Sequence, residues 1–275
     1  MSRTAPRLKW HQLRRRRSDP VFLRANLEAA LAAGAACEVD LLATADGHLV
    51  CLHEPMLEEE TTGRGPVAAA GRREIEMLRQ VASDGTPLDE APLFLDEIVR
   101  AVRRHGPQDQ GLVQLDIKVP NEELNPLVLD RFGTLLGDQV RAFTAGGCSW
   151  EAILRLAEAA PGLRRGFDPL DFHEHAPPRD SAGFRALAEL TRATAPDADI
   201  YYLHGDLVLA GLDRGVNMIE LVKAGGAEVD VWTIDADRPG LREVLSKLIG
   251  AGCDQITTND PDALTPMVRE IAACS

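Results

Sequence analysis

The chain has 275 residues, a formal net charge of −13, and a hydrophobic share of 45%. The length fits one eight-stranded α/β barrel, which typically takes about 250 residues, and the hydrophobic share is ordinary for a globular protein. The negative charge argues against nucleic acid as a partner, because a polyanion is repelled at long range. No apolar run approaches the roughly 20 residues that an integral membrane segment needs.

The cysteines and the N-terminal residues bear on the cellular compartment. Five cysteines at scattered positions make no disulfide framework and no CxxC pair. The first 19 residues contain no apolar region of the kind that a secretory signal has. We therefore expect a reduced, cytoplasmic protein and leave an exported form open. The sequence predicts no particular oligomeric state.

Strand-like and helical segments alternate along the chain from residue 7. A first strand (7–13) precedes an amphipathic helix (19–34), and a second strand (35–43) turns at Asp46-Gly47 into a return strand (48–54). An acidic stretch with Gly and Pro and one short helix (71–82) then interrupts the alternation over residues 55–93. Beyond it we expect strands at 111–119, 139–145, 163–168, 198–204, 228–235 and 254–259, and helices at 93–106, 124–137, 149–162, 182–195, 217–226, 241–252 and 261–273.

Eight strands in this series are each followed by a helix. Repeated βα units imply parallel strands with crossover helices, and eight of them in one chain predict an α/β fold of the (β/α)8 TIM-barrel type. An open dinucleotide-binding sheet is less favoured because no G-x-G-x-x-G follows the first strand. We expect residues 1–275 to form a single barrel domain, with an insertion over approximately 55–93 after the second strand.

Charged side chains stand inside two of the predicted strands. Residues i and i+2 share a face of a strand, so Glu38 and Asp40 point the same way, as do Asp116 and Lys118. Barrel strands are buried on both faces, where unpaired carboxylates are costly. A bound divalent cation would compensate, because hard cations prefer carboxylate oxygens. The alternatives are a polar strand face at Glu38 and Asp40 and a simple Asp116–Lys118 ion pair.

Histidines lie near the same end of the predicted barrel. His11 lies in the first strand and His53 ends the return strand, so both can reach the C-terminal end, where barrel enzymes keep their chemistry. Two imidazoles beside a cation and a lysine are the parts of an acid–base phosphoryl-transfer site. His204 ends the sixth strand and is a candidate pocket residue by position. We expect His173 and His175 to lie in a solvated loop, since no third zinc ligand is spaced nearby.

The order of these motifs resembles the glycerophosphodiester phosphodiesterase family. Residues 27–68 are similar to the family's helix, E-x-D strand, DG turn, HD and TTxGxGPV segment, and "VDVWTID…GAGCDQITTNDPDAL" is similar to its closing "VxVWTVN…GVDGIxTDxP". The resemblance covers nearly the whole chain and implies a TIM-type barrel that acts on a small anionic phosphodiester. It also implies specific roles: a divalent cation, Mg²⁺ or Ca²⁺, on Glu38, Asp40 and Asp116, a catalytic pair of His11 and His53, and substrate contacts from Lys118 and Trp232.

The first strand departs from the family pattern. The family has His-Arg-Gly there, with an arginine that helps to hold phosphate, whereas this chain has Gln12 in that place and an arginine run, Arg14–Arg17, shortly after it. Gln12 becomes a candidate substrate-binding residue, and one of the four arginines could replace the missing one.

Two further departures concern the acidic residues. Glu54 replaces the Asp that normally follows the second histidine, and Asp116 replaces a Glu. The sphingomyelinase D-like phospholipases, which are relatives of the family, also lack His-Arg-Gly and have an Asp-x-Lys third strand. We therefore expect a cation-dependent phosphodiesterase with histidine acid–base catalysis. Two alternatives stay open: a phospholipase D-like lyase that forms a cyclic phosphate, and a barrel that binds a phosphodiester without cleaving it.

Overall fold

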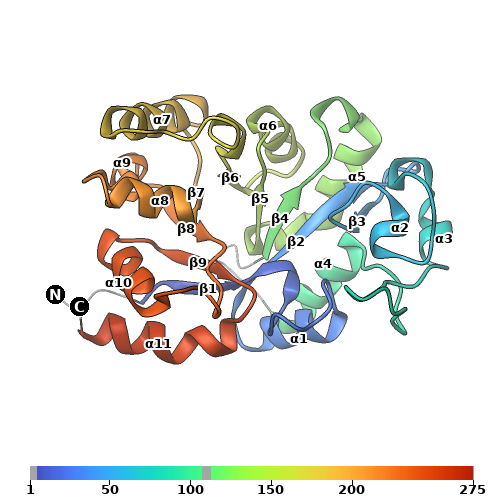
Figure 1. Cartoon of the computed structure of the whole chain (residues 1–275). Helices are drawn as coiled ribbons and strands as arrows, with labels where there is room; N and C mark the ends of the chain where they lie inside the picture. Colours follow the sequence, from blue (N-terminus) through green and yellow to red (C-terminus); the bar gives the residue numbers. More distant parts are fainter. Residues whose placement is uncertain (1–4, 107–112, 275) are drawn as a thin grey trace. The chain divides into compact units, whose positions relative to one another are not determined.

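The computed structural model describes residues 5–106 and 113–274, so the first two residues of the strand expected at 111–119 lie outside the described residues. The chain divides into two compact units, which are described separately. Unit 1 comprises Met1–His11, Arg15–Arg17 and Arg165–Ser275, and unit 2 comprises Gln12–Arg14 and Ser18–Arg164. In Figure 1, most of unit 2 runs from blue to yellow-green and most of unit 1 from yellow to red.

Unit 2 contains three parallel strands and one antiparallel return strand, in the order β5-β4-β2-β3. The strands are β2 (Ala36–Ala43), β3 (Leu49–Cys51), β4 (Val113–Ile117) and β5 (Phe143–Gly146). The helices of regular length are α1 (Arg24–Ala32), α4 (Leu95–His105), α5 (Pro126–Leu136) and α6 (Trp150–Ala159). Every residue of β2 is buried, and the β2–β4 register sets Asp40 opposite Asp116. Neighbouring residues in register point to the same face, so the acidic residues of the two strands converge.

The insertion follows β3 and consists of short helical turns. They are α2 (Leu57–Glu60), η2 (Val67–Ala69) and α3 (Arg72–Ile75). The helix expected over 71–82 ends after one turn, because Gln80 and Val81 instead form isolated bridges with Thr61 and Pro87. A hydrophobic cluster joins the insertion to the hairpin of β2 and β3 and to the start of α4: Leu42, Val50, Leu52, Leu57, Val67, Ala70, Ile75 and Phe94.

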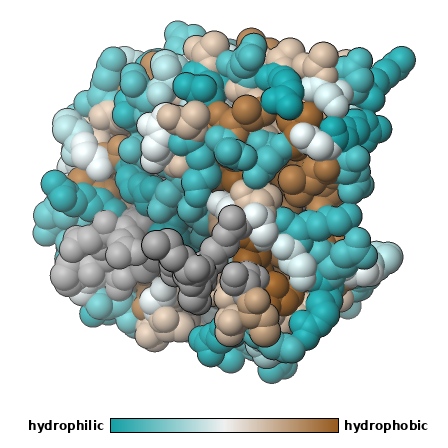
Figure 2. All heavy atoms as spheres, turned by 90° about the vertical axis from the view of Figure 1, so that its left-hand side faces the viewer, coloured by the Kyte–Doolittle hydropathy of each residue, from teal (hydrophilic) through white to brown (hydrophobic). Residues whose placement is uncertain are grey.

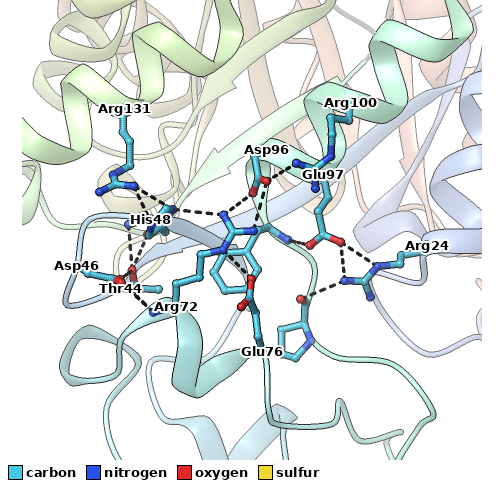
Figure 3. A network of polar contacts seen from close by, with 12 residues as sticks. Arg24, Thr44, Asp46, His48, Arg72, Glu76, Asp96, Glu97, Arg100 and Arg131 are labelled. Carbon is cyan, nitrogen blue, oxygen red and sulfur yellow. Dashed lines mark hydrogen bonds and ion pairs between the residues drawn. The ribbon is translucent and has the colours of Figure 1, made fainter.

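A polar network centred on Arg72 connects the insertion to the rest of unit 2 (Figure 3). The Arg72 guanidinium lies 2.9 Å from Asp96, at the start of α4, and stacks over the Phe94 ring at 4.6 Å. It also lies 3.4 Å from His48 in the hairpin turn, and Arg131 of α5 approaches the other ring nitrogen of His48 at 2.7 Å. Burial and the two arginines lower the pKa of His48, which favours its neutral form. The network thus holds the hairpin that leads to His53.

Unit 1 contains five parallel strands in the order β1-β9-β8-β7-β6. They are β1 (Arg7–Trp10), β6 (Arg164–Phe167), β7 (Ile200–His204), β8 (Glu228–Trp232) and β9 (Gln255–Thr258). The helices are α7 (Ser181–Thr194), α8 (Gly205–Leu212), α9 (Met218–Lys223), α10 (Leu241–Ala251) and α11 (Pro261–Cys274), and α10 and α11 lie side by side (Figure 1). Helix α8 was not predicted: it starts directly after β7, and the His204 side chain caps its first turn.

The eight parallel strands and their intervening helices confirm the predicted (β/α)8 barrel class. Several boundaries differ from the prediction, among them those of β5 and β1. Strand β5 begins at Phe143 rather than 139, because η4 (Gly137–Ala142) forms a 3-10 turn before it. His11 lies just beyond β1, in the turn η1 (His11–Leu13), where Gln12 has a positive φ of 51°. Among the helices of residues 5–106 and 113–274, none combines the length and hydrophobicity of a membrane span.

The surface of the face drawn in Figure 2 is mainly hydrophilic, with hydrophobic side chains in smaller areas between polar ones. Over the described residues, the large hydrophobic side chains that are exposed are Met77, Leu127, Leu154 and Leu190. They come from four different segments: the end of the α3 turn, α5, α6 and α7. The apolar residues are otherwise concentrated in the strands and on the inner sides of the helices, as a barrel core requires.

Candidate active site

Three carboxylates of unit 2 meet at β2 and β4. Oxygen atoms of Glu38, Asp40 and Asp116 lie within 4.8 Å of one another. Glu38 and Asp40 are only 4% and 1% exposed. The i, i+2 spacing on β2 and the register with β4 produce this arrangement, so the structure brings together the three acidic residues that the sequence singled out.

Two neighbouring residues partly compensate the acidic cluster. The Lys118 ammonium lies 2.7 Å from Asp116 and 3.2 Å from Asp40, so the Asp116–Lys118 ion pair exists within the cluster. Gln12 donates its backbone N–H to Glu38 at 2.7 Å and its side-chain amide to Asp40 at 2.9 Å. When ionised, the three carboxylates exceed Lys118 by two negative charges, which a divalent cation balances.

The pKa of Asp40 indicates that Lys118 and Gln12 do not fully balance the negative charge of the acidic cluster. Burial and the nearby Glu38 carboxylate raise the pKa of Asp40 to about 8, and Lys118 offsets only part of this. Burial alone would lower the pKa of Lys118, but Asp116 and Asp40 raise it above its ordinary value, so Lys118 is cationic. A set of converging carboxylate oxygens is the type of ligand that hard divalent cations bind. The residues present therefore fit such a cation.

The His53 side chain is positioned by acidic residues on its own loop and in the insertion. One oxygen of Glu60, on α2, accepts the backbone N–H groups of His53 and Glu54 at 2.6 and 2.8 Å. The Nδ1 atom of His53 lies 2.8 Å from a Glu54 oxygen. Burial alone would lower the pKa of His53, but Asp40 and Glu54 raise it above its ordinary value. Because Glu54 engages Nδ1, Nε2 is the nitrogen with a transferable proton.

In unit 1, His11 is oriented by a side-chain relay that the sequence reasoning missed. Its Nδ1 lies 2.9 Å from Oδ1 of Asn259, whose Nδ2 donates to both oxygens of Asp235 at 3.1 and 3.0 Å. A carboxylate accepts hydrogen bonds and cannot donate them, so Asp235 fixes the orientation of the Asn259 amide. Oδ1 of Asn259 must then accept from His11, which places the hydrogen on Nδ1 and the lone pair on Nε2.

The family pattern contained a signal for this relay. Aligned with "WTVN" and "TDxP", this chain has Asp235 in the place of the family's Asn and Asn259 in the place of its Asp. The two residue types are exchanged between positions that hydrogen-bond each other. The exchange was visible in the sequence, but only the structure shows that the two positions touch and that one of them reaches His11.

Two of the four arginines after His11 have acidic partners in unit 1. Arg15 pairs with Asp262 at 2.9 Å, and Arg17 pairs with Asp237 at 2.6 Å and with Asp235 at 3.4 Å. Arg17 therefore supports the relay at Asp235. That one arginine of this run replaces the family's phosphate-binding arginine stays a prediction.

The ends of β7 and β8 bring His204 and Trp232 together. The two residues are in register, and their rings meet edge to face at a centroid distance of 5.0 Å. His173 was expected in a solvated loop, and that expectation is wrong: it is only 6% exposed, whereas His175 has a side chain that is 91% exposed. Burial and the nearby His204 lower the pKa of His173. The loop after β6 folds inward because Phe172 packs on Phe167, at a ring distance of 5.8 Å.

A buried polar layer lies one step deeper in the strands of unit 1. Lys9 and Asp230 form an ion pair at 2.8 Å with exposures of 3% and 0%, and Thr257 donates to Asp230 at 2.7 Å. Lys9 also lies over the Tyr202 ring at 4.6 Å. These four residues precede His11, Trp232, Asn259 and His204 by two positions each. Residues i and i+2 share a face, so the layer supports the upper residues.

The fold is shared with solved phosphodiesterases. An Oleispira antarctica phosphodiesterase is 20% identical, with a TM-score of 0.67 over 96% of this chain and 97% of that chain. A glycerophosphodiester phosphodiesterase of Agrobacterium tumefaciens is 22% identical, with a TM-score of 0.66 over 94% of this chain and 98% of that chain. A glycerophosphodiester phosphodiesterase of Parabacteroides distasonis is 16% identical, with a TM-score of 0.66 over 98% of each chain. No curated protein matches the chain.

The amino-acid sequence identifies the family of the chain, whereas the similar structures show only its fold. Residues 25–263 match the sequence model of the Glycerophosphoryl diester phosphodiesterase family. The barrel, the acidic cluster and this match define a phosphoric diester hydrolase. The chain belongs to the glycerophosphoryl diester phosphodiesterase family, which confirms the resemblance found in its motifs.

Proposed function

We propose that this protein is a divalent-cation-dependent phosphodiesterase that cleaves a small glycerophosphodiester by histidine acid–base catalysis. The observation that carries the proposal is the convergence of Glu38, Asp40 and Asp116 beside Lys118. Two buried carboxylates and a partly buried one beside a single lysine are costly unless a bound cation balances their charge. The proposal takes residues 1–275 as one catalytic domain, with the insertion over approximately 55–93.

The cation is proposed to bind Glu38, Asp40 and Asp116 and to be Mg²⁺ or Ca²⁺, because both prefer oxygen ligands. When bound, it neutralises charge on the phosphate oxygens and stabilises the five-coordinate transition state. Lys118 adds a fixed positive charge to the phosphate site. Gln12 stands where the family has arginine, and its amide already donates to Asp40, so it orients the carboxylates and offers hydrogen bonds without charge.

The two histidines are assigned opposite roles in an in-line displacement at phosphorus. Nε2 of His11 removes the proton of the nucleophile, because the relay through Asn259 leaves the lone pair on that nitrogen. The nucleophile is water or a neighbouring hydroxyl of the substrate. As the bond from phosphorus to the leaving oxygen breaks, Nε2–H of His53 protonates that oxygen. The Glu54 carboxylate, which lies 2.8 Å from Nδ1, favours the protonated form of His53, which supports its role as the acid.

A similar solved structure and two side chains of this protein support the proposed substrate class. The similar Oleispira antarctica phosphodiesterase was solved in complex with the product sn-glycerol-3-phosphate. Trp232 and His204, which meet at the ends of β8 and β7, are proposed to contact the substrate. We also propose a cytoplasmic location, which is supported by five cysteines that remain as thiols.

A lyase that forms a cyclic phosphate from a lysolipid is the second candidate. It is supported by Gln12 in place of the family's arginine and by the Asp116-x-Lys118 strand, two features that the sphingomyelinase D-like phospholipases share. The histidine roles are unchanged, and the nucleophile is the neighbouring hydroxyl of the head group.

Phosphorus-31 NMR distinguishes these outcomes. The protein is incubated with Mg²⁺, Ca²⁺ or EDTA and a panel of glycerophosphodiesters and lysophospholipids. The proposal predicts a phosphomonoester from a glycerophosphodiester with a cation and no product with EDTA. A stable cyclic phosphate from a lysolipid indicates the lyase. His53→Gln should abolish turnover and His175→Gln, a change at an exposed residue, should not; full activity of His53→Gln would show that the acid is misassigned.

A further inference from the structure

Three basic side chains of unit 2 meet at the turn between β2 and β3 (Figure 3). His48 ends this turn, Arg72 is the first residue of α3, and Arg131 lies in the middle of α5. Nη1 of Arg131 lies 2.7 Å from Nε2 and 3.4 Å from Nδ1 of His48, and Nη1 of Arg72 lies 3.4 Å from the same Nδ1. The guanidinium groups of two arginines therefore face the nitrogens of one imidazole ring.

The ring of His48 has too few lone pairs for these contacts. A guanidinium nitrogen only donates, and a neutral imidazole has one nitrogen with a lone pair and one with a hydrogen. At 2.7 Å from Arg131, Nε2 must be the acceptor, so the hydrogen is on Nδ1. Burial and the two arginines lower the pKa of His48, which favours this neutral ring. Nδ1–H then lies beside two nitrogens that are also donors, and residues 5–106 and 113–274 supply no acceptor for it.

Arg131 also lacks acceptors. Within the part of the chain that the structure describes, its hydrogen-bond contacts are those with the His48 ring, and its buried Nε has no partner. A buried donor without a partner is costly, so such a group in a native protein calls for an explanation. A ligand that supplies acceptors at the guanidinium of Arg131 would explain why this arginine is held against a histidine.

Three carboxylates lie around Arg72, and each is engaged by it. Glu76 accepts from Nε at 2.7 Å, Asp96 accepts from Nη1 at 2.9 Å, and Asp46 accepts the backbone N–H at 3.0 Å. These contacts fix Arg72 and leave the second hydrogen of Nη1 facing His48. The donors that remain for a ligand are this hydrogen, the ring N–H and the guanidinium of the arginine on α5.

The segments that carry the three side chains are held in place by their own contacts. The backbone N–H of His48 donates to Oγ1 of Thr44 at 2.9 Å. Gly47 packs so closely on α5 that a Cβ atom there would lie 2.8 Å from the Leu127 side chain. The start of α5 is capped by Asn125. Donors that are positioned in advance lose little conformational entropy when a ligand binds.

We propose that His48, Arg72 and Arg131 form a binding site for one phosphate-type oxyanion. An oxygen placed against the ring accepts from Nδ1–H and from the guanidinium groups, so the opposed donors share one acceptor. Arginine is the preferred partner of phosphate oxygens, because its planar group donates several hydrogen bonds with a fixed charge. The site contains none of the proposed cation ligands, and the inference does not depend on the proposed reaction. The phosphate is either free or carried by a small organic phosphomonoester.

Isothermal titration calorimetry of the full chain with sodium phosphate, and separately with glycerol 3-phosphate, tests the proposal. EDTA is present throughout so that no divalent cation at the acidic cluster recruits phosphate, and sodium chloride keeps the ionic strength constant. The proteins are wild type, Arg131→Gln and Arg103→Gln, which removes the same charge from an exposed ion pair on α4. Long-range proton–nitrogen NMR spectra of the wild type report the tautomer of His48 without any variant.

Phosphate should bind wild type and Arg103→Gln with the same Kd, and Arg131→Gln should weaken binding by about 10- to 100-fold, as the loss of charge-assisted hydrogen bonds predicts. The NMR spectra should show the His48 hydrogen on Nδ1. Tighter binding of glycerol 3-phosphate than of phosphate would identify an organic phosphomonoester as the ligand, and equal or weaker binding would identify free phosphate. Absence of phosphate binding to the wild type, an unchanged Kd in Arg131→Gln, or a hydrogen on Nε2 of His48 overturns the inference.

Discussion

Replacement of Asp40 by asparagine should stabilise the protein and remove its response to divalent cations. Burial and Glu38 raise the pKa of Asp40 from 3.8 to about 8, so without a cation the folded state holds a proton there that the unfolded state releases. Folding stability is therefore lost as pH rises from about 4 to about 8, because the folded state binds more protons in that window. The asparagine side chain in Asp40→Asn is uncharged at every pH, so the variant does not lose folding stability in this window.

The structure sets the size of the effect. The rise of the Asp40 pKa from 3.8 to about 8 corresponds to a loss of folding stability of roughly 6 kcal/mol at pH 8.5. Lys118 still pairs with Asp116 in the variant, but the new amide replaces hydrogen bonds imperfectly, so we expect a net gain of about 2–5 kcal/mol. For a chain of this size, that is a rise in Tm of about 5–15 °C. At pH 5 the gain should be much smaller, since Asp40 is then protonated in the folded wild type.

Differential scanning calorimetry at pH 5 and pH 8.5, with EDTA or Mg²⁺, measures both consequences. Mg²⁺ at 100 times its Kd should stabilise wild type by about 2.7 kcal/mol and should not stabilise Asp40→Asn. Asp138→Asn is the matched control, because Asp138 is exposed and lies far along the chain from the cluster. The reasoning is refuted if Asp40→Asn lowers Tm in EDTA at pH 8.5, or if Mg²⁺ stabilises the variant as much as wild type.

Three further predictions address the surroundings of the site. Asp230→Asn removes the charge partner of buried Lys9 and should lower the free energy of unfolding by about 3 kcal/mol in urea titrations; an unchanged midpoint would contradict the role of the layer. Arg72→Ala breaks the half-buried ion pair with Asp96 and should lower the free energy of unfolding by about 1–3 kcal/mol. Arg103→Ala breaks an exposed ion pair and should change the free energy of unfolding by no more than about 0.5 kcal/mol. Equal losses in the two variants would exclude an anchoring role for Arg72. Asn259→Asp places a negative charge beside His11 and favours its protonated form, so the acidic limb of the kcat/KM profile should move to higher pH, and an unmoved limb would argue against His11 as the base.

The acidic cluster was predictable because it depends on short-range rules. The i, i+2 spacing of Glu38 and Asp40 fixes a common face, and charged residues in an otherwise apolar barrel strand are conspicuous. Asp116 and Lys118 follow the same rule on β4, and the parallel register of barrel strands brings the two pairs together. The barrel itself followed from the alternation of strands and helices.

The remaining features depend on contacts between residues distant in sequence. His173 resembles a solvated loop histidine, and only the packing of Phe172 on Phe167 shows that it turns inward. The Lys9–Asp230 pair spans 221 positions and depends on strand order, which local patterns do not specify. Helix α8 was missed because Gly205 and the apolar run after it resemble the end of a strand, and its cap is a histidine rather than a common capping residue.

The hydrogen-bond relay of His11 was only partly predictable from the sequence. The exchange of Asn and Asp at positions 235 and 259 could be read from the motifs, but its meaning depends on a hydrogen bond between strand ends. The structure converts the exchange into a tautomer for neutral His11, and the proposed role of His11 as the base rests on that tautomer.

The central claim is that a divalent cation on Glu38, Asp40 and Asp116 is needed for phosphodiester cleavage. The most direct measurement is kcat/KM for a glycerophosphodiester at saturating Mg²⁺, for wild type, Asp116→Asn and the exposed control Asp138→Asn. We predict a loss of kcat/KM of about 100-fold or more in Asp116→Asn, equivalent to several kcal/mol of transition-state stabilisation, and wild-type activity in the control. Wild-type activity of Asp116→Asn, or undiminished turnover by the wild type in EDTA, would contradict the account.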